Sequence, residues 1–285
     1  MKTVCEALGS SRSNIAASFG AVPAKPKARW GRPPADDAEL LSAIRDILAE
    51  QPTYGYWRVW GLLRRRAEAE GAAPVNRKRV YRVMRVHGLL LRRHAGGVEE
   101  RRHDGKVAVE ASNLRWCSDG FELACENGEK VRVAFALDCH DREALAHVAT
   151  TEGIKSEDVR DLMVASVETR FERVNRLPNV IEWLTDNGSG YIARDTRSFA
   201  RAIGLEPKTT PVTSPQSNGM AEAFVRTIKR DYARVNPMPD ARTVIASLPK
   251  WFRHYNEVHP HSALGYRAPR EFIARKSNRE AVSGL

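Results

Sequence analysis

Apolar residues recur every three or four positions in three stretches near the start of the chain, with polar residues between them. This spacing puts the apolar side chains on one face of a helix, so it predicts helices over 36–50, 55–69 and 76–88. Asn76 is suited to cap the third helix, because its side chain can accept a hydrogen bond from a free amide of the first turn. Together the three helices predict a small all-α domain over residues 36–94.

From Leu114 onward the pattern changes to short stretches in which apolar and polar residues alternate. Three such strands, followed by alternating helices and strands, predict an α/β domain with a mixed five-stranded sheet and flanking helices. The strands are expected over 115–124, 131–137, 144–150, 180–185 and 207–210. The helices are expected over 156–174, 193–203, 219–235 and 240–256.

Polar, proline-containing or glycine-containing stretches separate these regions and set the expected domain boundaries. Residues 1–35 are interpreted as an N-terminal segment that ends in a proline-rich basic linker. A second linker is expected over 95–112, between the helical domain and a larger domain. That larger domain is expected over 113–275 and includes the C-terminal helices, which leaves 276–285 as a tail.

Positive charge is concentrated at the N-terminal end of the chain. The formal net charge is +11, and residues 1–100 carry 18 Lys/Arg against 10 Asp/Glu. Clustering of this kind predicts a polyanionic partner such as DNA, with a role in solubility as the alternative. The chain contains no run of about 18 uncharged apolar residues, so no membrane span is expected. The four cysteines lack zinc-site spacing, which favours a cytoplasmic protein with reduced thiols.

The third predicted helix is the strongest candidate for contact with DNA. Its inner stripe is expected to consist of Val80, Val83, Met84 and His87. Three short helices with a basic third helix are typical of a helix-turn-helix that presents its last helix to the major groove. A small helical bundle with a solvated basic face is the alternative. The basic residues expected to bind DNA are Arg77, Lys78, Arg82 and Arg85.

Asp119 is an acid in the middle of the first predicted strand. On a two-residue period it shares a face with Cys117, Phe121 and Leu123. A carboxylate that points towards an apolar layer is costly unless it is paired or bound to a cation. The alternative is a twist at Gly120 that turns Asp119 towards solvent.

Two further acids lie where an element ends or begins. Asp186 follows a buried strand and opens a glycine-rich turn, at the kind of strand end where α/β proteins bind ligands. An ordinary turn is the alternative. Glu222 lies in the first turn of the helix that opens at Gly219, with Arg226 and Lys229 along the same face. That arrangement suits a metal beside a DNA backbone, and it equally suits a surface ion pair.

These three acids together predict a metal site for phosphoryl transfer. A strand, a strand end and a helix start can converge on one point, and oxygen ligands suit Mg²⁺. Two such ions about 4 Å apart would hold the attacking and leaving oxygens of a DNA phosphodiester. The acids act as ligands in this hypothesis. No covalent enzyme–DNA intermediate is expected, because no nucleophilic Ser or Tyr stands beside a suitable base.

Several motifs of the chain resemble one known family. Asp186 and Glu222 are separated by 35 residues, a spacing typical of the retroviral-integrase superfamily and its insertion-sequence relatives. The surrounding blocks resemble the second-reading-frame (OrfB) proteins of the insertion-sequence-three family, in particular its insertion-sequence-two subgroup. The blocks that carry this resemblance are Arg115–Phe121, Phe135–Leu145, Leu184–Ser189, Ser214–Glu222, Lys229–Tyr232, His254–Tyr266 and Pro269.

The resemblance implies a ribonuclease-H-like fold with a catalytic triad of Asp119, Asp186 and Glu222. It implies that the triad binds two Mg²⁺ or Mn²⁺ ions and that the enzyme cuts and joins DNA at the terminal inverted repeats of a mobile element. Lys229 matches the family's basic residue that contacts the DNA end, and Arg226 is a candidate to assist. Glu122 departs from the aromatic-rich pattern of many relatives and therefore needs an outward-facing position.

The resemblance also implies partners and a location. The upstream first-frame (OrfA) protein, often joined to the second-frame product by programmed frameshifting, is expected to be required for full activity. A homo-oligomer on DNA in the bacterial cytoplasm, at the nucleoid, is expected. The rival hypotheses are a non-catalytic repressor that uses only residues 36–93 and a structure-selective nuclease. The histidines of the His254–Tyr266 block are interpreted as packing residues, with a metal site as the alternative.

Overall fold

The computed structural model describes residues 36–92, 108–172, 177–186, 188–209 and 219–283. Residues from Ala38 onward form one compact unit. The expected N-terminal segment, residues 1–35, and most of the expected linker over 95–112 lie outside the described residues. Within the described ranges, no helix is both long enough and apolar enough to cross a membrane.

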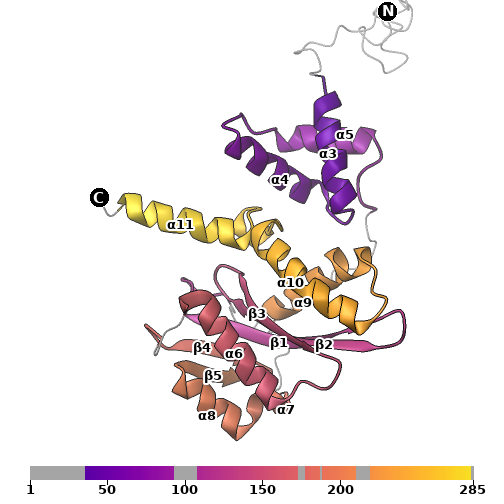
Figure 1. Cartoon of the computed structure of the whole chain (residues 1–285). Helices are drawn as coiled ribbons and strands as arrows, with labels where there is room; N and C mark the ends of the chain where they lie inside the picture. The colour runs from indigo at the N-terminus through magenta and orange to yellow at the C-terminus, as the bar shows by residue number, and fades with distance from the viewer. Residues whose placement is uncertain (1–35, 93–107, 173–176, 187, 210–218, 284–285) are drawn as a thin grey trace, which may run out of the picture. The chain divides into compact units, whose positions relative to one another are not determined.

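Three helices, α3 (Ala38–Glu50), α4 (Tyr56–Ala69) and α5 (Arg77–Val86), form the predicted helical domain (Figure 1). Their shared core includes Ile44, Val59 and Val80, each fully buried. The Asn76 side chain caps α5 by accepting a hydrogen bond of 2.8 Å from the Lys78 amide. His87 was expected in the inner stripe, and this is wrong, because α5 ends at Val86 and leaves His87 exposed as the capping residue.

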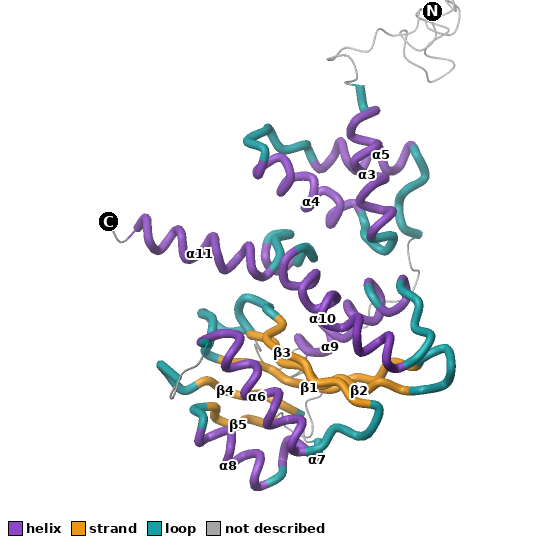
Figure 2. Tube along the Cα trace, viewed as in Figure 1, coloured by secondary structure: helices purple, strands orange, loops and turns teal. Residues whose placement is uncertain are grey.

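A mixed five-stranded sheet forms the centre of the larger domain, as predicted (Figure 2). The strands lie in the order β3-β2-β1-β4-β5. The first three strands pair antiparallel, whereas β4 pairs parallel with both β1 and β5. Their bounds are β1 (Arg115–Ala124), β2 (Lys130–Asp138), β3 (Ala144–Thr150), β4 (Ile181–Thr185) and β5 (Leu205–Thr209).

Helices cover both faces of the sheet, because successive residues of a strand point to opposite sides. Cys117 and Phe135 pack on the face covered by α9 (Gly219–Asp231) and α10 (Ala241–Glu257). Trp116 and Ala134 pack on the face covered by α6 (Ser156–Phe171) and α8 (Arg194–Ala202). The remaining helices are α7 (Ser189–Ile192), α11 (Pro269–Ser283) and the short 3₁₀ turns η2 (Ala233–Val235) and η3 (Ser262–Leu264).

Two C-terminal elements differ from the sequence-based boundaries, and one agrees with them. The helix expected over 219–235 ends at Asp231 and continues only as the 3₁₀ turn η2. The helix expected over 240–256 forms as α10 and runs through Pro249, although proline removes one backbone donor. The helix α11 extends to Ser283 and so crosses residue 275, where the tail was expected to begin.

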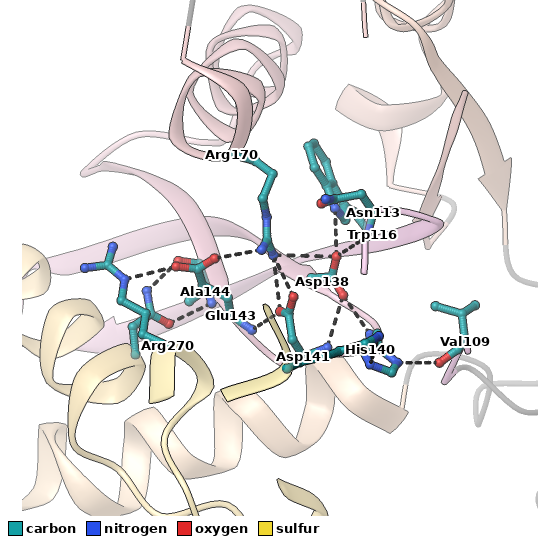
Figure 3. Close-up of polar contacts among 12 residues, drawn as sticks. Val109, Asn113, Trp116, Asp138, His140, Asp141, Glu143, Ala144, Arg170 and Arg270 are labelled. Carbon is teal, nitrogen blue, oxygen red and sulfur yellow. Dashed lines mark hydrogen bonds and ion pairs between the residues drawn. The ribbon is translucent and has the colours of Figure 1, made fainter. Parts of the chain in front are cut away.

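A buried ionic cluster fixes the turn that joins β2 to β3 (Figure 3). Arg170 of α6 lies 3.1 Å from Asp141 and 3.2 Å from Glu143, and 3.6 Å from Asp138. Asp138 also accepts hydrogen bonds from the amides of His140 and Asp141. Because the three acids are almost fully buried, each depends on these partners to offset its loss of hydration.

The His254–Tyr266 block packs against α4, in agreement with its interpretation as packing. The Tyr54 hydroxyl lies 2.8 Å from Nδ1 of His259, and the Trp57 and Tyr266 rings stack with centroids 5.0 Å apart. Gly61 allows this approach, because a Cβ at that position would lie 2.9 Å from Cβ of Tyr266. The helical domain is therefore joined to the C-terminal part of the chain by specific side-chain contacts.

Candidate functional site

The register of two parallel strands leads towards Asp119 and Asp186. In the β1–β4 pair, Cys117 lies opposite Leu184, and Asp119 and Asp186 each follow two residues later, Asp186 just after β4 ends at Thr185. Both Cys117 and Leu184 pack on the face that α9 covers. Asp119 is two residues beyond Cys117 in the same strand, so it is on that face too. The charge of Asp186 acts on Asp119, which agrees with the two carboxylates being close.

Hydrogen bonds from local amides orient the two aspartates. The Gly120 amide donates to Oδ1 of Asp119 over 2.7 Å, and the Gly188 amide donates to Oδ1 of Asp186 over 3.0 Å. A Cβ at position 188 would lie 3.1 Å from Oδ1 of Asp186, so a residue larger than Gly188 would displace this carboxylate by a few tenths of an ångström. The glycine-rich turn that the sequence shows after Asp186 thus serves to position its carboxylate.

Glu222 is brought to this face by the packing of α9. It is partly buried in the first turn of that helix. Phe224, two residues later, contacts Phe135 of β2, with ring centroids 4.5 Å apart. Phe135 is the residue directly opposite Asp119 in the β1–β2 pair. A single ring contact therefore anchors the start of α9 beside the strand position of Asp119.

The electrostatics of Asp119 reflect the nearness of the other two acids. Its pKa is raised from 3.8 to about 6, chiefly by burial; the Gly120 amide partly offsets this effect, and the charges of Asp186 and Glu222 add to it. In the part of the chain that the structure describes, no three His, Cys, Asp or Glu side chains are arranged to hold one metal ion. The three carboxylates are thus electrostatic neighbours in this conformation, without metal-ligand geometry.

Tyr191 belongs to this neighbourhood, although no sequence pattern singled it out. Its hydroxyl lies 3.0 Å from Oγ of Ser118, the residue next to Asp119. Burial raises the pKa of Tyr191, and the charges of Asp119 and Asp186 add to that shift. The phenol therefore stays protonated at neutral pH, which makes it unsuited to act as a nucleophile.

Asp119→Asn is expected to stabilise the folded protein at pH 7. A raised pKa means that the native state binds this proton more tightly than the unfolded chain does. Ionisation of Asp119 therefore lowers stability as the pH rises from about 4 to about 6, and asparagine removes this loss. Since Asp119 is only partly buried, the expected gain is about 1–3 kcal/mol.

Urea unfolding of both proteins at several pH values, without divalent metal, measures this difference. The advantage of Asp119→Asn should disappear below about pH 3, where the wild-type carboxyl is protonated in both states. Equal stability at pH 7, or an advantage that persists in full below about pH 3, would contradict the assignment of a destabilising charge to Asp119.

Arg226 and Lys229 are the two basic residues of α9 that were predicted to contact DNA. Both side chains are exposed to solvent, as such contact requires. Lys229 lies near Glu122, whose pKa is lowered chiefly by a hydrogen bond from Lys130 and in small part by the Lys229 charge. Glu122 faces outward as expected and forms ion pairs with Lys130 and Arg132. Arg226 lies one helical turn after Glu222.

The basic residues of α5 that were predicted to bind DNA are all exposed. The guanidinium carbon of Arg77 lies 3.6 Å from the centroid of the Trp57 ring, so this side chain is held over an aromatic face. DNA contact by the four residues of this set, Arg77, Lys78, Arg82 and Arg85, remains a prediction.

The candidate metal site of the C-terminal histidines is not formed. His259 is buried and bonded to Tyr54, and burial lowers its pKa. His254 bonds to the Tyr232 hydroxyl over 2.9 Å. Each of these rings thus has a packing partner. Among the described residues, neither ring belongs to a group of side chains that could hold a metal ion.

Comparison with known proteins places most of the chain in one family. An HTH-like domain matches residues 34–95, and two integrase core domain families match 109–215 and 203–269. The transposase InsD for insertion element IS2A/D/F/H/I/K of Escherichia coli is 57% identical over 244 residues, which cover 85% of this chain and 80% of the relative. The transposase InsD for IS2-9 of Escherichia coli strain K12 is also 57% identical, over 85% of this chain and 79% of the relative.

Solved structures show a more distant likeness. A simian T-cell lymphotropic virus intasome in complex with PP2A regulatory subunit B56 gamma matches with a TM-score of 0.44 and 13% identity, over 80% of this chain and 73% of that chain. The catalytic core domain of BIV integrase matches with a TM-score of 0.42 and 17% identity, over 59% of this chain and 99% of that chain. On the integrase core match and the identity to the InsD proteins, the chain belongs to the DNA transposases of insertion-sequence-two elements, within the insertion-sequence-three family, and its larger domain has the ribonuclease-H-like integrase fold.

Proposed function

We propose that Asp119, Asp186 and Glu222 form the catalytic centre of this transposase and that the enzyme cuts and joins DNA at the terminal inverted repeats of its element. The β1–β4 register supports the proposal, because it pairs Cys117 with Leu184 on the face that α9 covers, and Asp119 and Asp186 each follow two residues later. Glu222 on that helix adds the third charge, which raises the pKa of Asp119.

The donor set fits divalent cations. The charges of Asp186 and Glu222 disfavour ionisation of Asp119, a cation shared by the three carboxylates would offset this repulsion, and oxygen ligands suit Mg²⁺ or Mn²⁺. Two bound ions would supply Lewis acidity to the attacking and leaving oxygens of the phosphodiester. The chain itself holds the carboxylates in place through the amides of Gly120 and Gly188 and through the packing of Phe224.

The DNA is proposed to lie across the exposed basic side chains. Lys229 and Arg226 stand on the helix that carries Glu222, so they are suited to hold the end of the element beside the carboxylates. The exposed face of α5 is suited to bind the flanking duplex in its major groove. The residues assigned to that face are Arg77, Lys78, Arg82 and Arg85.

Assembly is proposed to involve further chains. The first-frame protein of the element, joined as a frameshift fusion, is proposed to supply additional recognition of the ends. Pairing of two ends then requires more than one copy of the catalytic chain on the DNA. This activity is proposed to take place in the bacterial cytoplasm, at the nucleoid.

A nicking assay with supercoiled plasmid and Mg²⁺ tests the proposal. Wild type, in the presence of the first-frame protein, is expected to nick a plasmid that carries the element ends. Glu222→Gln is expected to be slower by about a thousandfold, since lost charge stabilisation of several kcal/mol corresponds to that factor. Glu152→Gln, at an exposed position outside the site, is the matched control and should nick at the wild-type rate. Equal nicking rates of wild type and Glu222→Gln would contradict the proposal that Asp119, Asp186 and Glu222 form the catalytic centre.

A further inference from the structure

A pocket of about 640 Å³ lies between the start of α4, one side of α9 and the His254–Tyr266 block. This volume is in the range of pockets that bind small organic groups. Arg226, one helical turn after Glu222, is part of its lining, so the pocket reaches the side of α9 that carries Glu222.

Three buried polar atoms of the lining have no hydrogen-bond partner among the described residues. They are Oγ1 of Thr53, Nε of Arg142 and Nε2 of His261. A hydrogen bond joins the His261 ring to the Tyr255 backbone, and burial lowers the pKa of His261 to about 3. The ring is therefore neutral, and Nε2 is left as an acceptor. Nε of Arg142 is a donor and the Thr53 hydroxyl can donate or accept, so the pocket presents an unused donor, an unused acceptor and an unused hydroxyl.

The backbone is strained at two residues of the same lining. Arg142 and Tyr266 have φ angles of 66° and 62°, in the left-handed region that side-chain-bearing residues rarely adopt. Such strain costs about 1–3 kcal/mol and is retained where the surrounding structure imposes it. At Arg142 the surrounding structure is the buried cluster around Arg170, which fixes the turn on both sides of residue 142 (Figure 3).

Aromatic rings form a rigid wall of the pocket. Tyr56, Trp57 and Tyr266 all belong to the lining. Trp57 is held between the stacked Tyr266 ring and the Arg77 guanidinium, so its orientation is fixed from both sides. A fixed aromatic wall suits a flat ligand that stacks or packs edge-on against it.

The charge of the lining favours an anionic ligand. The lining contains four arginines and no Asp or Glu among the residues that the structure describes. Arg58 and Arg230 are paired with the buried Asp231, whereas Arg226 is exposed on the side of α9 that carries Glu222. A flat group with hydrogen-bonding edges and a nearby negative charge has the chemistry of a nucleotide.

We propose that this pocket receives one unpaired nucleotide of the bound DNA, with its base against the aromatic wall and its edge on Arg142 and His261. Arg226 then meets the adjacent phosphate. The inference rests on the proposed DNA-cutting function, because the pocket reaches the side of α9 that carries Glu222. Holding one nucleotide out of the duplex fixes the strand next to the carboxylates, which defines the phosphodiester that they reach.

Binding of three short duplexes of identical sequence tests this proposal. The first ends in one unpaired 3′ nucleotide, the second has an abasic residue in that position, and the third is blunt. Fluorescence anisotropy in EDTA reports affinity without cleavage. Wild type should bind the first duplex about tenfold more tightly than the abasic one, the effect of one stacked base. Arg142→Met should lose this preference and bind the abasic duplex within about twofold of wild type.

Controls separate the pocket from general DNA affinity and from catalysis. Arg85→Ala, on the exposed face of α5, should weaken binding to all three duplexes by the same factor. Glu222→Gln should keep the preference, so that failure of the proposed catalytic centre and failure of the pocket give different results. Because Arg142 lies in a strained turn, 2-aminopurine as the unpaired base gives a second readout on wild type, and its emission should fall on binding. No preference by wild type, or unchanged emission, overturns the proposal.

Discussion

Asp186→Asn is expected to abolish Mg²⁺-dependent nicking, with a loss of about a thousandfold or more, and to leave DNA affinity within about twofold of wild type. Asparagine keeps the size of the side chain, and its oxygen can still accept the hydrogen bond that the Gly188 amide donates to Asp186. What it removes is the negative charge that a shared cation needs. The loss therefore falls on the chemical step, where each 1.36 kcal/mol changes the rate tenfold.

Affinity has to be measured on the same preparations to separate the two effects. The exposed basic residues of α5, which lie outside the carboxylate site, are proposed to provide most of the phosphate contacts. Arg82→Ala is the reciprocal variant, since it should weaken binding and flatten its salt dependence while the chemical step at saturating DNA is retained. Wild-type nicking by Asp186→Asn, or a parallel loss of binding and nicking, would argue against its role as a metal ligand.

Arg170→Met is expected to destabilise the fold by about 3–5 kcal/mol. Arg170 is the cation at the centre of three nearly buried acids, Asp138, Asp141 and Glu143. Methionine fills a similar volume but leaves these carboxylates buried without their partner, and removing one member of a buried ion pair has a cost of this size. For a domain whose total stability is about 5–15 kcal/mol, such a loss is a large fraction.

The matched control is Arg270→Met, which removes a half-exposed partner of Glu143 from the edge of the same cluster. Solvent already screens that pair, so its loss should be below about 1 kcal/mol. Urea unfolding at pH 7 and pH 5 measures both variants. The deficit of Arg170→Met should shrink at pH 5, because a carboxylate left without its cation takes up a proton and becomes neutral. Equal stabilities of the two variants would mean that the cluster does not depend on Arg170.

Local patterns of the sequence were sufficient to predict the elements that carry the candidate site. The alternation of apolar and polar residues predicted β1, and Asp186 with the glycine-rich turn after it predicted the end of β4. Both signals are local, because strand faces and turn chemistry are properties of neighbouring residues. The mixed sheet was predicted from three consecutive strands followed by a helix–strand alternation, whereas the strand order was not. The 35-residue spacing between Asp186 and Glu222 came from resemblance, since it depends on how α9 returns to the sheet.

Features that depend on distant residues were not visible in the sequence. Arg170 is in α6, whereas the acids that it contacts are in the turn between β2 and β3. No local sequence pattern predicts such a cluster. The packing of the His254–Tyr266 block on α4 depends on Gly61, which inside a helix is otherwise only an unfavourable residue. Arg142 had no signal at all, because its strained φ angle and unpartnered Nε exist only in the folded chain.

The most direct test of the catalytic centre is a titration of Mn²⁺ into the DNA-bound protein, followed by electron paramagnetic resonance of the free ion. If Asp119, Asp186 and Glu222 share cations beside a phosphodiester, wild type will remove Mn²⁺ from solution, and each of Asp119→Asn, Asp186→Asn and Glu222→Gln will do so much more weakly. If all three variants take up Mn²⁺ as wild type does, the carboxylates do not form a common site.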